Sequence, residues 1–276
     1  MILRALALAL LVGCTAHAPP ADPGPGDTLL RYKLAPFKLR EQATLVVKSR
    51  GPALTGEMQV ALTGQLDVEA IGSKLKVVHR VLDVTQAEGS GAYSTLGDGS
   101  RVDLAKLLRE ASGAEIVDVR GELDKAASKT LTENAADKAD YQGVTDAVLK
   151  LPRDLPEEGL AVGVPFTSKK SEQEDIAGIT LAVETGTTTT LRGVTTTDGR
   201  RLAELDLAEE RVGATEVEMK GLRGGVAFHG TSAGTLVFDL DAQLPVSLRL
   251  ESTVTMELPD QAITIETEHV ATYTAI

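Results

Sequence analysis

The segment from Leu54 to Ala70, LTGEMQVALTGQLDVEA, decides the fold. Apolar or small residues occupy every even position of this segment, and most odd positions are polar. Alternation with a period of two is typical of a half-buried β-strand. At ~3.3 Å per residue the strand would be ~56 Å long, against a usual ~17–20 Å. We therefore expect Gly56 and Gly64, on the apolar side, to permit bends or bulges.

Further strands are predicted on both sides of this segment. Leu29–Leu34 and Glu41–Lys48 precede it. Lys74–Gln86 follows it as an antiparallel partner, after a turn at Gly72-Ser73. Two apolar residues in succession, Val77-Val78, interrupt the alternation of that partner and indicate a β-bulge.

The last third of the chain repeats the pattern. Even positions are apolar or small from Val226 to Leu240 and again from Val246 to Leu258. Asp198-Gly199 predicts a tight hairpin, and Pro259-Asp260 a turn into Ile263–Ile276. The fold class predicted is mainly β, with long antiparallel strands forming a curved sheet, half-barrel or open barrel.

A short helical insert is expected at about residues 100–158. Asp103 to Ala111 follows a serine cap and ends at Gly113, and the charged, alanine-rich stretch from 125 to 150 ends at Leu151-Pro152. The insert separates two strand-rich parts, residues 28–86 and 162–275. We expect all of residues 28–276 to form one β-rich domain.

The first residues look like an export signal. One basic residue, Arg4, precedes an apolar run from Ala5 to Val12, which is too short to span a bilayer. Leu11, Val12 and Gly13 before Cys14 resemble the bacterial lipobox. That resemblance implies cleavage of a signal peptide at residues 1–13 and lipidation of Cys14, the one cysteine in the sequence. The alternative is an ordinary secretory signal cleaved after Ala16-His17-Ala18.

Residues 14–27 are expected to form a lipidated, flexible tether, because four prolines and two glycines lie between Thr15 and Gly26. The expected partner is therefore a membrane, through the lipid anchor at Cys14. By resemblance to the sorting rule of enteric bacteria, Thr15 after the cysteine implies the outer membrane. The body would be periplasmic or surface-exposed.

Composition narrows the possible partners. The formal net charge is −12, so the chain should repel nucleic acid, and no nucleic-acid partner is expected. No tryptophan and eight Phe and Tyr residues leave the core to aliphatic side chains. The chain is long enough to bury such a core.

We looked for catalytic and metal-binding patterns and predict neither kind of site. Gly230 to Gly234 matches G-x-S-x-G around Ser232, but that motif must join a strand to a helix, and here the alternation continues through both flanks. His79, His229 and His269 fall on separate predicted strands, and for His229 and His269 solvated imidazoles are expected. The prediction is no catalytic residue, no metal and no cofactor, with ligand-binding residues unknown.

Several short segments together resemble a known group. These are Leu30-Arg31-Tyr32-Lys33-Leu34, then Leu151-Pro152, Pro156 and Val162–Phe166, then Gly234–Leu240 and Leu244–Ser247. The layout resembles a family of uncharacterised bacterial lipoproteins with a domain of unknown function, in which a tryptophan usually falls near the position of Phe166. It is more distantly similar to the half-barrels of periplasmic lipoprotein and lipid carriers.

Two functions are left open by these observations. The first is a non-enzymatic structural or interaction role for an outer-membrane-anchored lipoprotein in the bacterial envelope, with an envelope protein as its partner. The alternative is a carrier or binding protein for an acyl chain or other apolar ligand. Space left by Gly56, Gly64, Gly230 and Gly234 would favour the alternative, whereas bends at these glycines would not.

Overall fold

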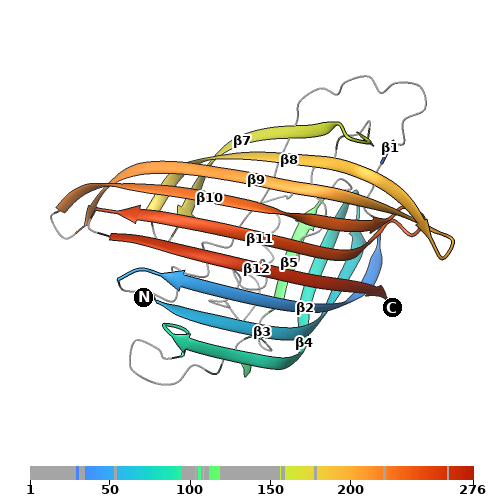
Figure 1. The fold of residues 1–276 in the computed structure, drawn as a ribbon, viewed down its shortest axis with the longest axis horizontal. Coiled ribbons are helices and arrows are strands. Elements are labelled where there is room, and N and C mark those ends of the chain that lie inside the picture. Colours follow the sequence, from blue (N-terminus) through green and yellow to red (C-terminus); the bar gives the residue numbers. More distant parts are fainter. Residues whose placement is uncertain are drawn as a thin grey trace.

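One antiparallel sheet of ten strands forms the body of the protein in a computed structural model (Figure 1). The structure describes residues 29–30, 35–52, 55–94, 103, 105–106, 108, 112–118, 156, 159–176, 179–219, 222–259 and 261–276. The strand order across the sheet is β5-β4-β3-β2-β12-β11-β10-β9-β8-β7. In Figure 1 the sheet runs from β7 at the top to β4 at the bottom, with β5 behind it.

The strands are long, as the alternation predicted. Their bounds are β2 Phe37–Arg50, β3 Gly56–Ile71, β4 Lys74–Gly91, β5 Ser112–Val117, β7 Pro165–Ile176, β8 Ile179–Thr197, β9 Arg200–Met219, β10 Leu222–Asp239, β11 Leu244–Leu258 and β12 Gln261–Ala275. A separate two-stranded sheet pairs β1 (Leu29–Leu30) with β6 (Leu160–Ala161).

The two strand-rich parts of the sequence meet in the middle of the sheet. β2 pairs with the neighbouring β3 on one side and with β12, from the other end of the chain, on the other. The register places Ala43 opposite Ala271 and Leu62. The ten strands therefore share one continuous inner face.

Buried aliphatic side chains define that inner face. One row of paired residues crosses eight strands, and its members are Leu191, Leu205, Leu236, Leu248, Ala271, Ala43, Leu62 and Val84. All eight are buried. The outer face carries the intervening polar residues, as period-two alternation requires. At ~25 cal/mol per Å² of apolar surface removed from water, such rows are the main source of stability.

The sheet is neither closed nor strongly curled. Its edges are β5 and β7, which do not pair with each other, and β5 covers only Leu75–Arg80 of β4. Long antiparallel strands are thus confirmed, whereas a half-barrel or open barrel is not what they form. The expected helical insert at about 100–158 falls mostly outside the described residues, and the described part of it contributes the strand β5.

The turns largely follow the prediction, and one register shift between β3 and β4 falls at Gly64, where a bend or bulge was expected, but the bulge predicted at Val77-Val78 is wrong. Gly72, Asp198 and Gly199 have positive φ angles of 59°, 53° and 77°, as tight hairpins require. Val77 and Val78 pair regularly with β3. The extra residues in β4 are instead Leu82 and Thr85, where the register with β3 shifts.

Three of the four inner-face glycines are explained by close contacts rather than by open space. A Cβ on Gly56 would collide with the carbonyl oxygen of Ser90, and one on Gly234 with that of Arg249. At Gly64 it would meet the side chains of His79 and Glu41. Gly230 has ordinary van der Waals surroundings. Bends and close packing therefore account for glycines that could have indicated a ligand cavity.

Candidate functional site: a buried carboxylate between two imidazoles

Four polar side chains, from strands β2, β4 and β12, lie close together on the inner face. Glu41 on β2 lies opposite Tyr273 on β12 and opposite Gly64 on β3. His79 on β4 lies opposite Leu66, two residues along from Gly64. His269 on β12 lies opposite Leu45. By register, the two imidazoles lie on opposite sides of the Glu41 row.

Each oxygen of the Glu41 carboxylate faces a different imidazole. Glu41 Oε2 lies 3.5 Å from His79 Nε2, and Oε1 lies 3.9 Å from His269 Nε2. Glu41 is 0% exposed, His269 1% and His79 5%. These separations are longer than an ordinary hydrogen bond but short enough for strong electrostatic coupling in a buried site. We call Glu41, His79 and His269 the carboxylate–imidazole line.

Burial sets the protonation of this site. It raises the pKa of Glu41 well above 4.5, and the neighbouring Tyr273 hydroxyl offsets this only in part. Burial lowers the pKa of His79 to about 3, from 6.5. It raises the pKa of Tyr273, as does the nearby Glu41 carboxyl. Burial disfavours the charged form of each group, so His79 is held neutral near neutral pH and the protonated form of Glu41 is favoured.

Gly64 makes room for the line. A Cβ at this position would lie 2.8 Å from His79 Nε2 and 2.9 Å from Glu41 Oε2. Any side chain would therefore displace the carboxylate or the imidazole. The glycine in the alternating segment 54–70 is thus part of the site.

The sequence prediction for the histidines was partly wrong. His229 is exposed on the outer face and lies 3.5 Å from Glu210, as expected of a solvated imidazole. His269 was also expected to be solvated, but the inner face of β12 is formed by Ile265, Thr267, Ala271 and Tyr273, and His269 shares their side. His79 and His269, which the sequence left on separate strands, meet at one carboxylate.

The position of Glu41 in the alternation of β2 could have identified it as a buried carboxylate. In β2 the residues Leu39, Ala43, Leu45 and Val47 are buried and alternate with polar ones, and Glu41 occupies the apolar side. A carboxylate on the apolar side of a strand needs a buried partner. The partner could not be found from the sequence, because β12 lies more than two hundred residues further along.

Ser232 does not lie in a nucleophile elbow. It sits in the middle of β10, half-buried, opposite Ser252 and Glu209. The strand continues on both sides of it, as predicted. No group of three or more His, Cys, Asp or Glu side chains in the described part of the chain could hold a metal ion.

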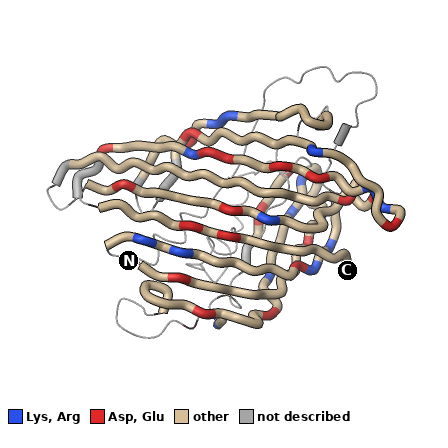
Figure 2. The backbone as a smooth tube through the Cα atoms, viewed as in Figure 1, with Lys and Arg blue, Asp and Glu red and all other residues tan. Residues whose placement is uncertain are grey.

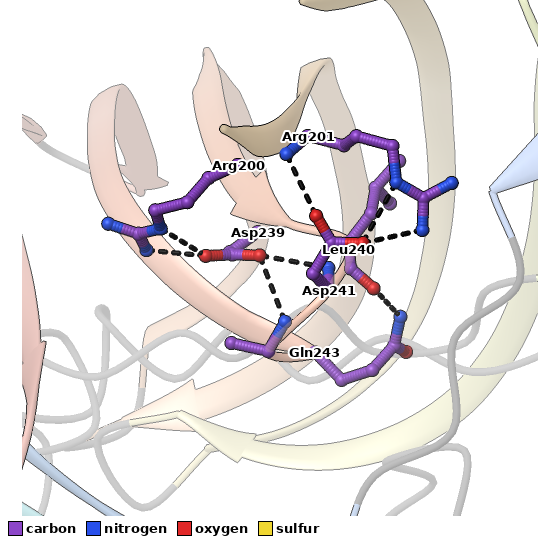
Figure 3. Close-up of polar contacts among 7 residues, drawn as sticks. Arg200, Arg201, Asp239, Leu240, Asp241 and Gln243 are labelled. Atoms are coloured by element: carbon purple, nitrogen blue, oxygen red, sulfur yellow. Dashed lines mark hydrogen bonds and ion pairs between the residues drawn. The ribbon is translucent and has the colours of Figure 1, made fainter. Parts of the chain in front are cut away.

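A second polar cluster lies at the end of the sheet where two turns meet (Figure 3). Asp239 accepts hydrogen bonds from the backbone N–H groups of Asp241 and Ala242 and, at 2.6 Å, from Arg200 Nε. Asp241 accepts hydrogen bonds from the side chain of Arg201. Burial favours a higher pKa for Asp239, but these backbone and arginine hydrogen bonds hold it below 3.8. These contacts connect the β8–β9 hairpin to the β10–β11 turn, and their geometry indicates a structural role. We call this cluster the clasp.

Charged residues of both signs are interspersed along neighbouring strands of the sheet (Figure 2). On β2 the pairs are Arg50 with Glu266 and Lys48 with Glu57. Asp67 is the buried exception. Burial favours a higher pKa for Asp67, but hydrogen bonds from Gln65 and Arg80 and the nearby cations hold it below 3.8. Such exposed pairs contribute little stability but give the sheet a mixed polar surface.

The predicted anchor lies outside the described residues. This applies to the signal peptide at 1–13, to the lipobox residues Leu11, Val12 and Gly13, to Cys14, and to the tether at 14–27. Among the helices of the described residues, none is long and apolar enough to cross a membrane.

Comparison with known proteins finds no family model and no curated sequence that matches the chain.

Proposed function

We propose that the chain is a lipid-anchored envelope protein of the outer membrane, with a non-enzymatic structural or interaction role. The observation that carries the proposal is the division of the ten-stranded sheet between a packed inner face and a broad polar outer face. The carboxylate–imidazole line is buried on the inner face, which supports a non-enzymatic role. The outer face, with mixed charges and many threonines, is the surface that a partner protein could meet.

The proposed anchor is tested by Cys14→Ser. A serine cannot receive the thioether-linked lipid, so the variant should accumulate as an unprocessed or soluble species. Cell fractionation and the mass of the N-terminal peptide measure this, with Thr15→Ser as the matched control that keeps the cysteine. Membrane fractionation of a processed Cys14→Ser protein would contradict the anchor.

A second candidate function is a carrier for an acyl chain or other apolar ligand. It is favoured by a row of residues on the inner face that are half-buried rather than sealed: Thr187, Glu209, Ser232 and Ser252. This polar row runs parallel to the apolar row of Leu191, Leu205, Leu236 and Leu248. An amphipathic ligand would suit such a face.

The two candidates are separated by native mass spectrometry of the full chain purified from its own membranes, with extraction and analysis of lipids. An apo mass, apart from the covalent anchor, supports the interaction role. A stoichiometric non-covalent apolar ligand supports the carrier. Ser232→Ala, in the half-buried row, should weaken retention of such a ligand, whereas Val212→Ala, on the outer face, should leave it unchanged.

A further inference from the structure

The carboxylate–imidazole line is unusual in its charge balance, because one carboxylate faces two imidazoles in an apolar interior. Two arrangements of protons leave the line without net charge. In the first, Glu41 is protonated and both imidazoles are neutral. In the second, Glu41 is ionised and one imidazole carries the proton. Adding a proton to either arrangement leaves one positive charge, and removing one leaves one negative charge.

Among the described residues, the surroundings offer little to balance either charge. On the inner face, the neighbouring described residues of β2, β3, β4 and β11 are aliphatic or glycine: Leu39, Ala43, Leu45, Leu62, Gly64, Leu66, Val77, Val81, Leu248 and Leu250. From β12 the facing titratable group is Tyr273. From β5 it is Glu115, half-buried opposite Val77 and one row beyond His79. An uncompensated charge in such a site is costly unless the structure opens.

We propose that Glu41, His79 and His269 form a two-sided proton switch, which keeps the inner face closed only while the line carries no net charge. Acid opens it by adding a proton to an imidazole. Alkali opens it by removing the proton that the carboxyl shares with the line. The three side chains come from β2, β4 and β12, so the opening would loosen the centre of the sheet, where β2 pairs with β12. This inference does not depend on the lipid anchor.

The direction of each effect follows from proton linkage. The unfolded chain binds a proton at His79 near pH 6.5, but the folded chain does so only near pH 3. In acid, His79 therefore raises the unfolding constant by up to tenfold per pH unit between those values. Glu41 acts in the opposite sense, because its carboxyl keeps a proton in the folded state above pH 4.5. Its contribution to stability is lost as the pH rises. The two effects offset each other between about pH 4.5 and pH 6.5, which predicts a plateau with a decline on each side.

The test is the unfolding equilibrium of the purified full chain from pH 3.5 to pH 9, by urea denaturation. His79→Leu should flatten the acid decline, so that the ratio of wild-type to variant unfolding constants rises about 100-fold from pH 7.5 to pH 4.5. Glu41→Gln should flatten the alkaline decline. His229→Gln is the matched control, since its imidazole is also 3.5 Å from a glutamate but is exposed, and it should follow the wild type throughout. Glu115→Gln should also keep both declines.

Opening of the inner face has its own readout. Binding of a hydrophobic dye should increase on both sides of the plateau before the far-ultraviolet circular dichroism changes. Should a variant fail to fold, the wild type alone decides: the ring proton signals of His79 should stay constant from pH 7.5 to pH 4.5. Titration of His79 in that range, or parallel profiles for the wild type, His79→Leu and Glu41→Gln, would overturn the proposal.

Discussion

At the scale of single residues, Gly64 is a position where glycine is required by the side chains packed against it. Its backbone is an ordinary extended strand, so conformational freedom does not explain it. The explanation is the space that His79 Nε2 and Glu41 Oε2 occupy next to its Cα. A position of this kind links the pairing of β2 and β3 to the chemistry of the buried line.

Gly64→Ala should therefore destabilise the protein by about 1–3 kcal/mol, because the added methyl overpacks the site. Urea denaturation at pH 6 measures the change. Gly186→Ala is the control, since the nearest atom to a Cβ there is 4.0 Å away. It should be neutral or slightly stabilising, because alanine limits the unfolded chain more than glycine does. Equal losses in the two variants would show that Gly64 is not a packing position.

The inner row makes a similar prediction for an aliphatic residue. Leu205 is completely buried, with Leu191 and Leu236 opposite it on the flanking strands. Leu205→Ala should cost about 2–5 kcal/mol through lost burial and the cavity that remains. Val212→Ala on the outer face of the same strand should change stability by less than about 0.5 kcal/mol. Denaturant midpoints for the two variants measure the difference, and a similar cost for both would contradict the assignment of faces in β9.

At the scale of elements, the β10–β11 turn is stabilised by a carboxylate that accepts hydrogen bonds from backbone N–H groups of the turn. Asp239 ends β10, caps two N–H groups of the turn and binds Arg200 at the start of β9 (Figure 3). Gln243 in the same turn has a positive φ of 57° and donates a side-chain hydrogen bond to the carbonyl of Leu240. The turn is thus set by side-chain hydrogen bonds at both of its ends.

Asp239→Ala should cost about 2 kcal/mol at pH 7, because it removes hydrogen bonds made to a charged group. Asp239→Asn keeps an acceptor for the two N–H groups and should cost less. The pKa of Asp239 is held below its ordinary 3.8, so its contribution is complete above that value and is lost as the pH falls below it. The gap in unfolding free energy between wild type and Asp239→Asn should hence narrow from pH 5 to pH 3. A gap that stays constant over this range would rule out the ionised clasp.

Periodicity was sufficient to predict strands such as β3, β10 and β11, because a face buried along its whole length leaves a direct record in the alternation. It predicted the turns at Gly72 and at Asp198-Gly199 for the same local reason. The glycine on the apolar side indicated the irregularity at Gly64, but Val77-Val78 did not mark a bulge, since both residues are buried in a regular register and the extra residues of β4 are Leu82 and Thr85. Nor could periodicity pair β2 with β12, and the candidate site depends on that long-range contact.

At the scale of the whole molecule, the sheet is assembled from contacts of very different range. Most neighbouring strands are consecutive hairpins, which form early because little loop entropy is lost. The pairing of β2 with β12 joins the two ends of the domain, and in it Glu41 meets Tyr273. High contact order slows folding, so this central seam should be the late step.

The order of the strands also bears on the seam itself. From edge to edge it runs β7, β8, β9, β10, β11, β12, β2, β3, β4, β5. Ile276 donates a backbone hydrogen bond to the carbonyl of Lys38, which places the last residue beside the start of β2. A circular permutant, with a short linker from Ile276 to Phe37 and new ends between β5 and β6, would turn the sheet into one uninterrupted up-and-down meander. All pairings of the ten-stranded sheet would be unchanged and every one of them would be local, although the short β1–β6 pairing would be lost, so the permutant should refold faster than the natural chain in stopped-flow experiments.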